Sequence, residues 1–298
     1  MNGQYDYALE KRLRANNPEL HKRFTDTVFV LQHILSNFKL IFPYFTDHSE
    51  LHSLNVIDFC NKIIGEEITK MNDDEIYCLL VGCYFHDTGM GISMKDFEAF
   101  SQDIDFGDYF ETHDRNDVQR IVRDFHNEYS GLFIKKYADL FEIPSKEHLN
   151  AIVQISRGHR KTNLKDIFEY PLDYKVPNGN TICLPYLAAM IRLADEIDVT
   201  AARNSHLLYD IPDLIINHNE IEFTKHEAVR DLIVEKDRFV MTYNVKEIDT
   251  FGADEQELEN SLKVLVSKMQ KTLDYCIDAT KNITKFEIHQ KVIVAQKI

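Results

Sequence analysis

The sequence predicts a mainly α-helical protein that carries a small C-terminal α+β extension, and three observations predict this class. Apolar residues recur at helical spacing from about residue 7 to about residue 201. After about residue 217 the period changes to two, which is typical of half-buried strands. The 298 residues include only 10 glycines and 7 prolines, which disfavours long linkers. We therefore expect a helical body over residues 1–216 and an extension over residues 217–298.

The first helices of the body are predicted from an apolar stripe and from end signals. Residues 20–42 form one long stripe, and Pro43 stops it because proline cannot continue a helix. Asp47 and Glu50 have capping-box spacing, so the next helix is expected to begin near His48.

The central helix of the body is expected at residues 76–85, which are apolar at almost every position. A helix that is hydrophobic all round belongs in a protein core. Asp73 or Asp74 is expected to cap its start, and Gly89 is expected to end it in a left-handed conformation.

Three further helices are expected to complete the body. An amphipathic stripe covers residues 118–133, and a shorter helix at residues 149–156 is expected to end near Gly158. Pro185 suits the first turn of a helix that runs to about Asp198.

Two segments depart from the helical period. Residues 95–114 are rich in Asp, Phe and Gly, and we interpret them equally well as a lid or as an ordinary connecting loop. In the extension, residues 239–245 alternate clearly and residues 286–294 alternate less perfectly, with a strong apolar stripe over residues 258–276 between them. This pattern predicts a small antiparallel sheet with one long helix packed on it.

The composition restricts the classes of partner. A net charge of −15 disfavours attraction to a long nucleic acid or an anionic membrane, but bound metal ions would still allow a small phosphorylated ligand. The five cysteines lack CxxC spacing and are expected to be reduced core residues of a cytoplasmic protein. The N-terminal residues lack a basic-then-apolar signal, and no apolar run reaches the ~18 residues that span a bilayer.

Imidazole and carboxylate side chains recur on or beside the apolar segments. With the adjacent His86 and Asp87 counted as one position, they are spaced by 34, 40, 33 and 36 residues, which suits one ligand per helix around a shared centre. Nitrogen and oxygen ligands that converge in a helical core are typical of a transition-metal site. The set consists of His52, His86, Asp87, His126, His159 and Asp195.

This ordered set resembles the motif series of the HD superfamily of metal-dependent phosphohydrolases. The matching words are DHSELHSLNV, YFHDTGMG, FHNEYSGL, RGHR and RLADEIDVTAAR, which match in order and spacing over roughly residues 48–203. The first, second and last words are most similar to the HD-CE branch, which is often found beside heat-shock-type ATPase modules. The residues that follow HD differ from those of the cyclic-dinucleotide, deoxynucleoside triphosphate and alarmone branches, so the resemblance does not extend to their substrates.

The resemblance implies a division of the ligands between two divalent ions. His52, His86, Asp87 and Asp195 would hold one ion, and His126 and His159 would hold a second with Asp87 bridging. Manganese, iron, nickel and zinc suit imidazole ligands, with magnesium as an alternative. The implied activity is hydrolysis of a phosphomonoester or phosphodiester, in a nucleotide or short oligonucleotide, by a metal-activated hydroxide.

Basic residues near the motif words are candidates to neutralise a bound phosphate. We expect Arg160, Arg192 and Arg203 to act beside Asp87 in catalysis, and the alternative for each arginine is a salt bridge. Asp198 is interpreted either as a group that orients a metal ligand by a hydrogen bond or as a surface residue.

Two other classes of function stay open at this point. The first is a metal-containing module that senses a ligand or mediates an interaction, working with a partner ATPase. The second is a di-iron oxygenase, because some HD proteins are similar in ligands but use O₂. For the hydrolase we expect a small phosphorylated ligand, no long nucleic acid and no membrane, with a homo-oligomer or an ATPase module as partner.

Overall fold

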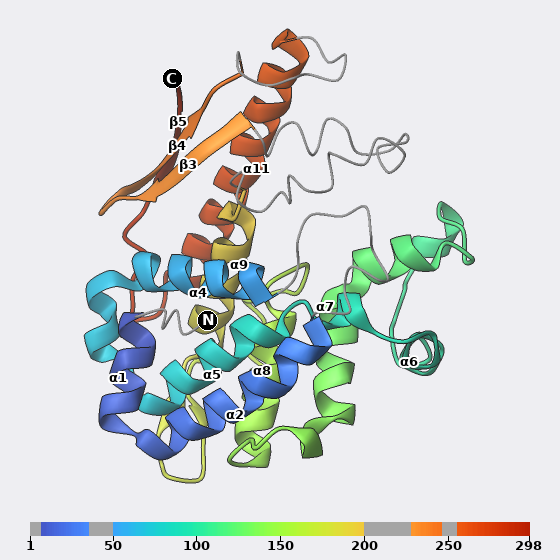
Figure 1. The fold of residues 1–298 in the computed structure, drawn as a ribbon, viewed down its shortest axis with the longest axis vertical. Coiled ribbons are helices and arrows are strands. Elements are labelled where there is room, and N and C mark those ends of the chain that lie inside the picture. Colours follow the sequence, from blue (N-terminus) through green and yellow to red (C-terminus); the bar gives the residue numbers. More distant parts are fainter. Residues whose placement is uncertain (1–6, 36–49, 200–227, 246–254) are drawn as a thin grey trace.

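The computed structural model describes residues 7–35, 50–199, 228–245 and 255–298, and over these ranges the protein is mainly helical (Figure 1). The predicted fold class is confirmed. None of the helices within these ranges combines the length and the apolar character needed to cross a bilayer. The expected Pro43 stop and the helix start near His48 lie outside the described residues.

The body is built around one fully buried helix. Its long helices are α1 (Ala8–Asn16), α2 (Pro18–Leu35), α4 (Glu50–Ile64), α5 (Asp73–Phe85), α7 (Val118–Lys136), α8 (Lys146–Arg157) and α9 (Leu184–Ile197). Helix α5 lies among α1, α2, α4, α8 and α9, and every residue from Asp74 to Phe85 is buried. The prediction of a helix buried on all sides is confirmed.

Short elements connect these helices. They are α6 (Met94–Phe100), the 3₁₀ turns η1 (Gly65–Lys70), η2 (Thr88–Gly91), η3 (Tyr109–Glu111) and η4 (Ala138–Leu140), and the hairpin β1 (Tyr174–Lys175) and β2 (Thr181–Ile182). The two hairpin strands pair antiparallel. Between α6 and α7, residues 101–117 contain the short turn η3 and no helix longer than it.

The start of α5 differs from the prediction. Asn72, and neither Asp73 nor Asp74, is the N-cap: its side chain accepts a hydrogen bond from the Glu75 amide, and the Glu75 carboxylate accepts one from the Asn72 amide. This reciprocal capping box satisfies two otherwise unpaired N–H groups, so the cap lies one residue earlier.

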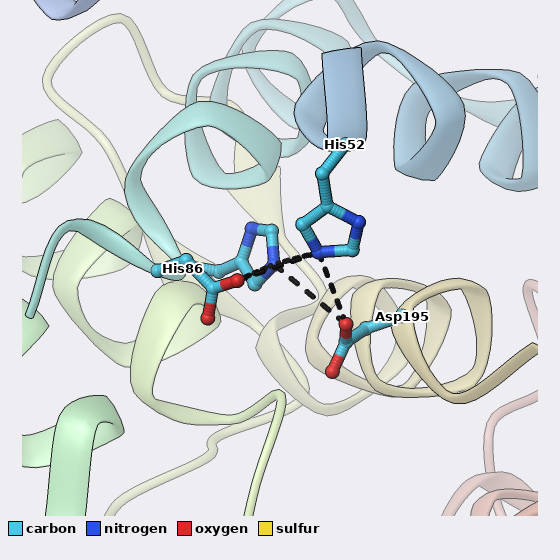
Figure 2. Close-up of side chains that lie close together, drawn as sticks. His52, His86 and Asp195 are labelled. Atoms are coloured by element: carbon cyan, nitrogen blue, oxygen red, sulfur yellow. Dashed lines mark hydrogen bonds and ion pairs between the residues drawn. The ribbon is translucent and has the colours of Figure 1, made fainter. Parts of the chain in front are cut away.

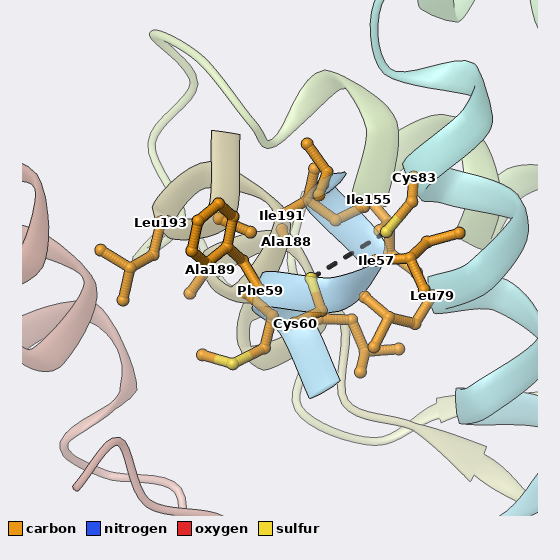
Figure 3. Packing of buried hydrophobic residues seen from close by; sticks show 14 of the residues in the cluster. Ile57, Phe59, Cys60, Leu79, Cys83, Ile155, Ala188, Ala189, Ile191 and Leu193 are labelled. Carbon is orange, nitrogen blue, oxygen red and sulfur yellow. Dashed lines mark hydrogen bonds between the residues drawn. The ribbon is translucent and has the colours of Figure 1, made fainter. Parts of the chain in front are cut away.

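Figure 3 shows the part of the hydrophobic core that lies between α4, α5, α8 and α9. The thiols of Cys60 on α4 and Cys83 on α5 are 4.0 Å apart, and all five cysteines are buried and unpaired, as predicted. Close packing of this core holds the inward ends of the four helices near one another.

The extension is a three-stranded sheet with one long helix. Strands β3 (Val229–Val234) and β4 (Arg238–Tyr243) pair antiparallel as predicted, but β5 (Val292–Lys297) pairs parallel to β4. The expectation of a wholly antiparallel sheet was wrong in this one pair. Helix α11 (Glu255–Thr280) returns the chain to the end at which β4 began, which is the crossover that parallel pairing requires.

Helix α11 packs against α9 of the body. Its buried stripe joins the same apolar cluster as the body helices; the stripe consists of Leu258, Leu262, Leu265, Met269, Leu273 and Cys276. The rings of Tyr186 in α9 and Phe286 beyond α11 also stack, with centroids 4.3 Å apart. The domain boundary expected near residue 216 stays a prediction. One apolar cluster contains residues from both the body and the extension.

A buried polar network holds the start of α5 to the hairpin and to α8. The Asp74 carboxylate accepts hydrogen bonds from His148 at 2.8 Å, Asn178 at 2.9 Å and Asn180 at 2.7 Å. Burial raises the pKa of this carboxyl, but the three hydrogen bonds outweigh burial and lower it to about 2.

We expect the stabilisation that this network gives to the wild-type protein to depend on pH. Because the pKa of Asp74 is lower in the folded than in the unfolded protein, its stabilisation is complete above pH ~4 and fades as the pH falls toward 2. At pH 7 we expect Asp74→Asn to lower the free energy of unfolding by about 2 kcal/mol, measured by urea titration.

The matched control is Asp73→Asn, because among the described residues the Asp73 carboxylate has only an exposed contact with Asn16 at 3.4 Å. We expect a smaller loss there. If the deficit of Asp74→Asn stayed constant down to pH 3, another feature of the substitution would be responsible.

Candidate metal centre

The structure brings all six predicted ligands to one point in the core. His52 comes from α4, His86 and Asp87 from the end of α5, His126 from α7, His159 from the turn after α8, and Asp195 from the last turn of α9. Figure 2 shows His52 and Asp195 pointing toward each other from different helices, with the His86 ring beside them. Residues separated by up to 143 positions thus share one site.

The six side chains form two groups that share Asp87. In the first group, His52 Nε2 lies 3.4 Å from Asp87 Oδ2 and 3.2 Å from Asp195 Oδ1, and His86 Nε2 lies 3.3 Å from Asp87 Oδ2. Metal–nitrogen bonds of about 2.0–2.1 Å place neighbouring ligand atoms about 2.8–3.4 Å apart in octahedral or tetrahedral geometry. The spacing of this group therefore suits one ion.

The second group uses the other oxygen of the shared carboxylate. His126 Nε2 lies 3.3 Å and His159 Nε2 3.8 Å from Asp87 Oδ1. Asp87 has φ −103° and ψ 5°, in the sparsely populated backbone region where active-site residues often occur. The two carboxylate oxygens thus face two different pairs of imidazoles.

Local helix geometry explains how three of the imidazoles are oriented. Each donates its Nδ1–H to the carbonyl three residues earlier: His86 to Cys83 at 2.7 Å, His126 to Arg123 at 2.6 Å, and His159 to Ser156 at 2.5 Å. Carbonyls at a helix end lack an intrahelical partner. His86 and His159 follow helix ends.

His126 lies inside α7, where the helix is kinked. Phe125 has φ −122° and ψ 15°, so the helix is interrupted one residue before His126. A kink leaves nearby carbonyls available to side chains, which accounts for the bond from His126 to Arg123.

His52 is oriented by a carboxylate instead. Its Nδ1 lies 2.7 Å from Asp198 Oδ2, and the Asp198 side chain is 1% exposed. The interpretation of Asp198 as an orienting group is confirmed. In all four imidazoles Nδ1 is therefore engaged and Nε2 points at the centre, as is usual for metal-binding histidines.

Electrostatics keep these groups in the states that metal binding needs. Burial lowers the pKa of His159 to about 4, and burial holds the pKa of His126 well below its ordinary value although Asp87 opposes this. Burial raises the pKa of Asp195, but the nearby His52 and His86 outweigh it, so this pKa lies well below its usual range. At neutral pH the two imidazoles are neutral and Asp195 is ionised.

The second group in particular fits a cation. His126 Nε2 and His159 Nε2 are 2.8 Å apart. A hydrogen bond at this distance needs a proton on one nitrogen, but both rings are neutral and hold their proton on Nδ1. Two lone pairs therefore face each other in the core, and a shared cation is the partner that relieves their repulsion.

Comparison of the sequence with protein-family models agrees with the family that the ligand pattern resembles. The model of the HD-CE family matches residues 42–281, which is most of the chain. The chain belongs to the HD-CE family. No curated protein and no solved structure matches it. The HD-CE match spans both the helical body and α11, so the family unit includes most of the extension.

One serine, which the sequence pattern did not single out as functional, holds the turn that carries Asp87. Ser130 Oγ donates to the His86 carbonyl at 2.6 Å and accepts from the Gly89 amide at 2.8 Å, so a single hydroxyl bonds the backbone on both sides of Asp87. Ser130 lies one turn after His126 on α7. That helical spacing within the word FHNEYSGL was the available signal.

Gly89 has a different role from the predicted one. Its φ is not positive, so it does not end α5 in a left-handed conformation. It lies in η2, where a Cβ atom would be 2.2 Å from the His126 carbonyl and 2.6 Å from the Ser130 nitrogen. Glycine is required here because the backbone of the Asp87 turn touches the backbone of α7.

The predicted phosphate-binding arginines have different surroundings. Arg160 is half-buried and close enough to His126 and Glu196 for its charge to lower their pKa values, and within the described ranges its guanidinium has no hydrogen bond or ion pair. Arg192 donates to the Gly158 and Thr162 carbonyls at 2.7 and 2.9 Å. Arg203 lies outside the described residues. The catalytic role assigned to each stays a prediction.

The segment at residues 95–114 is anchored next to His126. Tyr109 donates to Asp124 at 2.8 Å, and its ring and the Phe106 ring both meet the Phe125 ring edge-on at about 5 Å. Whether it acts as a lid stays a prediction. Its anchor on the two residues before His126 places it at the edge of the second group.

The close approach at Gly89 predicts a strong effect of one methyl group. We expect Gly89→Ala to separate the Asp87 turn from α7, to lower the free energy of unfolding by about 1–3 kcal/mol, and to weaken metal binding. Urea unfolding and metal analysis measure the two effects.

Gly91→Ala is the matched control in the same short helix. A Cβ atom there would find its nearest neighbour, the Ile34 carbonyl, 4.0 Å away. We expect near-wild-type stability and metal content for that variant. Equal behaviour of the two variants would contradict the packing explanation.

Proposed function

We propose that this HD-CE protein is a metal-dependent hydrolase that cleaves a phosphomonoester or phosphodiester bond in a nucleotide or short oligonucleotide. The observation that carries the proposal is the shared Asp87 carboxylate, whose two oxygens face two separate pairs of imidazole nitrogens. A pure scaffold has no need of two groups of potential metal ligands held together in its core.

Each ligand has a defined task in this proposal. The first ion would be held by His52, His86, Asp87 and Asp195, and the second by Asp87, His126 and His159. When bound, such a pair of ions activates water as a nucleophile and stabilises the oxygens of a phosphoryl group in transition. The nitrogen-rich donor set favours Mn, Fe, Ni or Zn, with Mg²⁺ as the less suited alternative.

The exposed edge of the centre indicates where a substrate is bound. The Asp195 side chain is 25% exposed, whereas the other ligands of the first group are at most 3% exposed. We propose that the phosphate approaches from the Asp195 side and that Arg160, which lies near both His126 and Glu196, neutralises it. Phosphoryl transfer needs mainly such positioning and charge neutralisation from the protein.

The proposal predicts separable effects for two ligands. We expect His126→Ala to lose one ion and keep the other, because the first group is complete without it, and hydrolysis to fall by at least ~100-fold. We expect Asp87→Ala to lose both ions. Metal analysis of the purified protein and a screen with nitrophenyl phosphate mono- and diesters, with Mn²⁺ or Fe²⁺ added, measure these effects.

His289→Ala is the control, because His289 lies in the extension and contacts only Glu67 among the described acids. It should keep wild-type metal content and activity. Full metal content and activity in His126→Ala would show that the centre holds one ion and that His126 is a structural histidine.

A further inference from the structure

The turn that carries His159 and Arg160 is conformationally strained. It spans residues 158–162 after α8, and Lys161 has φ 57°, a left-handed conformation that residues other than glycine rarely adopt. Such a conformation persists only when its surroundings impose it. The supports of this turn therefore decide where the His159 ring lies.

Helix α9 provides the first support. Arg192 Nε donates to the Gly158 carbonyl at 2.7 Å, and Nη2 donates to the Thr162 carbonyl at 2.9 Å and to its hydroxyl at 3.2 Å. One guanidinium thus joins both ends of the turn. One helical turn earlier, Ala188 packs so closely on Gly158 that a Cβ atom at Gly158 would lie 2.4 Å from the Ala188 Cβ.

Helix α11 of the extension provides the second support. The Arg192 guanidinium lies over the Tyr275 ring, 4.8 Å from its centroid. The Tyr275 hydroxyl accepts from the Leu164 amide at 2.8 Å and donates to the Thr162 carbonyl at 3.4 Å. The extension therefore touches both the guanidinium that clamps the turn and the turn itself.

We propose that Arg192 and Tyr275 are positioning residues for His159, and that the extension thereby sets the affinity of the second metal ion. Arg192 is 9% exposed and its Nε and Nη2 are bonded to the turn, so it acts through His159 rather than by contacting phosphate. The inference rests on the proposed two-ion centre. It explains why the HD-CE family match continues through α11.

The consequence for metal binding is selective. His159 is a ligand only in the second group, where its Nε2 is already the atom farthest from Asp87, at 3.8 Å. Loosening the turn moves this ligand and leaves the first group in place. Groups that orient metal ligands typically change metal affinity by about 10- to 100-fold.

The test is calorimetric titration of the metal-free full-length protein with Mn²⁺ alone. In Tyr275→Phe, which keeps the ring under Arg192 but removes the hydroxyl, we expect the second ion to bind roughly 10-fold more weakly and the first ion to bind as in wild type. Arg192→Met should weaken the second ion further. Urea unfolding of the metal-free proteins separates this effect from a general loss of stability.

Tyr186→Phe is the matched control. Tyr186 also joins body and extension through its stacking on Phe286, but within the described ranges its buried hydroxyl has no hydrogen-bond partner. Both ions should bind to it as in wild type.

The outcomes distinguish the two proposals. Two ions in wild type with unchanged affinities in Tyr275→Phe and Arg192→Met, or with both ions weakened equally, would overturn the positioning role alone. A single ion in wild type would overturn the two-ion centre and this inference together.

A second measurement examines the same coupling from the extension. Since linkage is reciprocal, filling the second site should slow hydrogen exchange of the Leu164 amide, the donor to Tyr275. His159→Ala, which keeps the first group, should abolish the slowing. An exchange rate that does not respond to Mn²⁺ in wild type would contradict the coupling.

Discussion

The structure depends on one electrostatic constraint: four imidazole rings and two carboxylates face one another inside the helical core. His126 and His159 present unprotonated nitrogens 2.8 Å apart, and the Asp87 carboxylate beside them is 3% exposed. Unpaired polar groups in a protein interior are costly. A cation could serve as a common partner for this whole set, so folding and metal binding are expected to be coupled.

The surrounding helices are arranged so that this constraint can be met. Three of the ligand imidazoles lie at a helix end or kink, where a free carbonyl three residues earlier holds the ring by its Nδ1. Backbone carbonyls that lack an intrahelical partner, and that would be costly to bury, therefore accept the hydrogen bonds that orient the ligand rings. Close contacts of the Gly89 backbone with the α7 backbone, and of the Gly158 backbone with the Ala188 methyl group, bring the ligand-bearing turns close enough to share one centre.

The extension takes part in this arrangement as well. Helix α11 packs along α9, which carries Asp195, and Lys268 of α11 pairs with Glu196 at 2.9 Å, one residue from that ligand. Seven residues further along α11, Tyr275 reaches the turn of His159. The extension therefore packs against two segments that carry ligands of the centre, the end of α9 and the turn of His159.

The sequence by itself determined the helical class, the buried helix α5, the order of the six ligands and the change of period at the extension. These features depend on the spacing of residues along the chain, and such spacing can be recognised in the sequence without a structure. The family resemblance then supplied the division of the ligands into two groups.

Only the tertiary structure decided which polar residues serve those ligands. Asn72 rather than an aspartate caps α5, because the capping geometry depends on the backbone angles at that residue. Gly89, Ser130, Arg192 and Tyr275 gain their roles from contacts between segments that are 30 to 113 residues apart. The parallel pairing of β5 likewise follows from the path of α11 through space. Such contacts leave no periodic signal, because a hydroxyl or a guanidinium acquires its partner only when the helices pack.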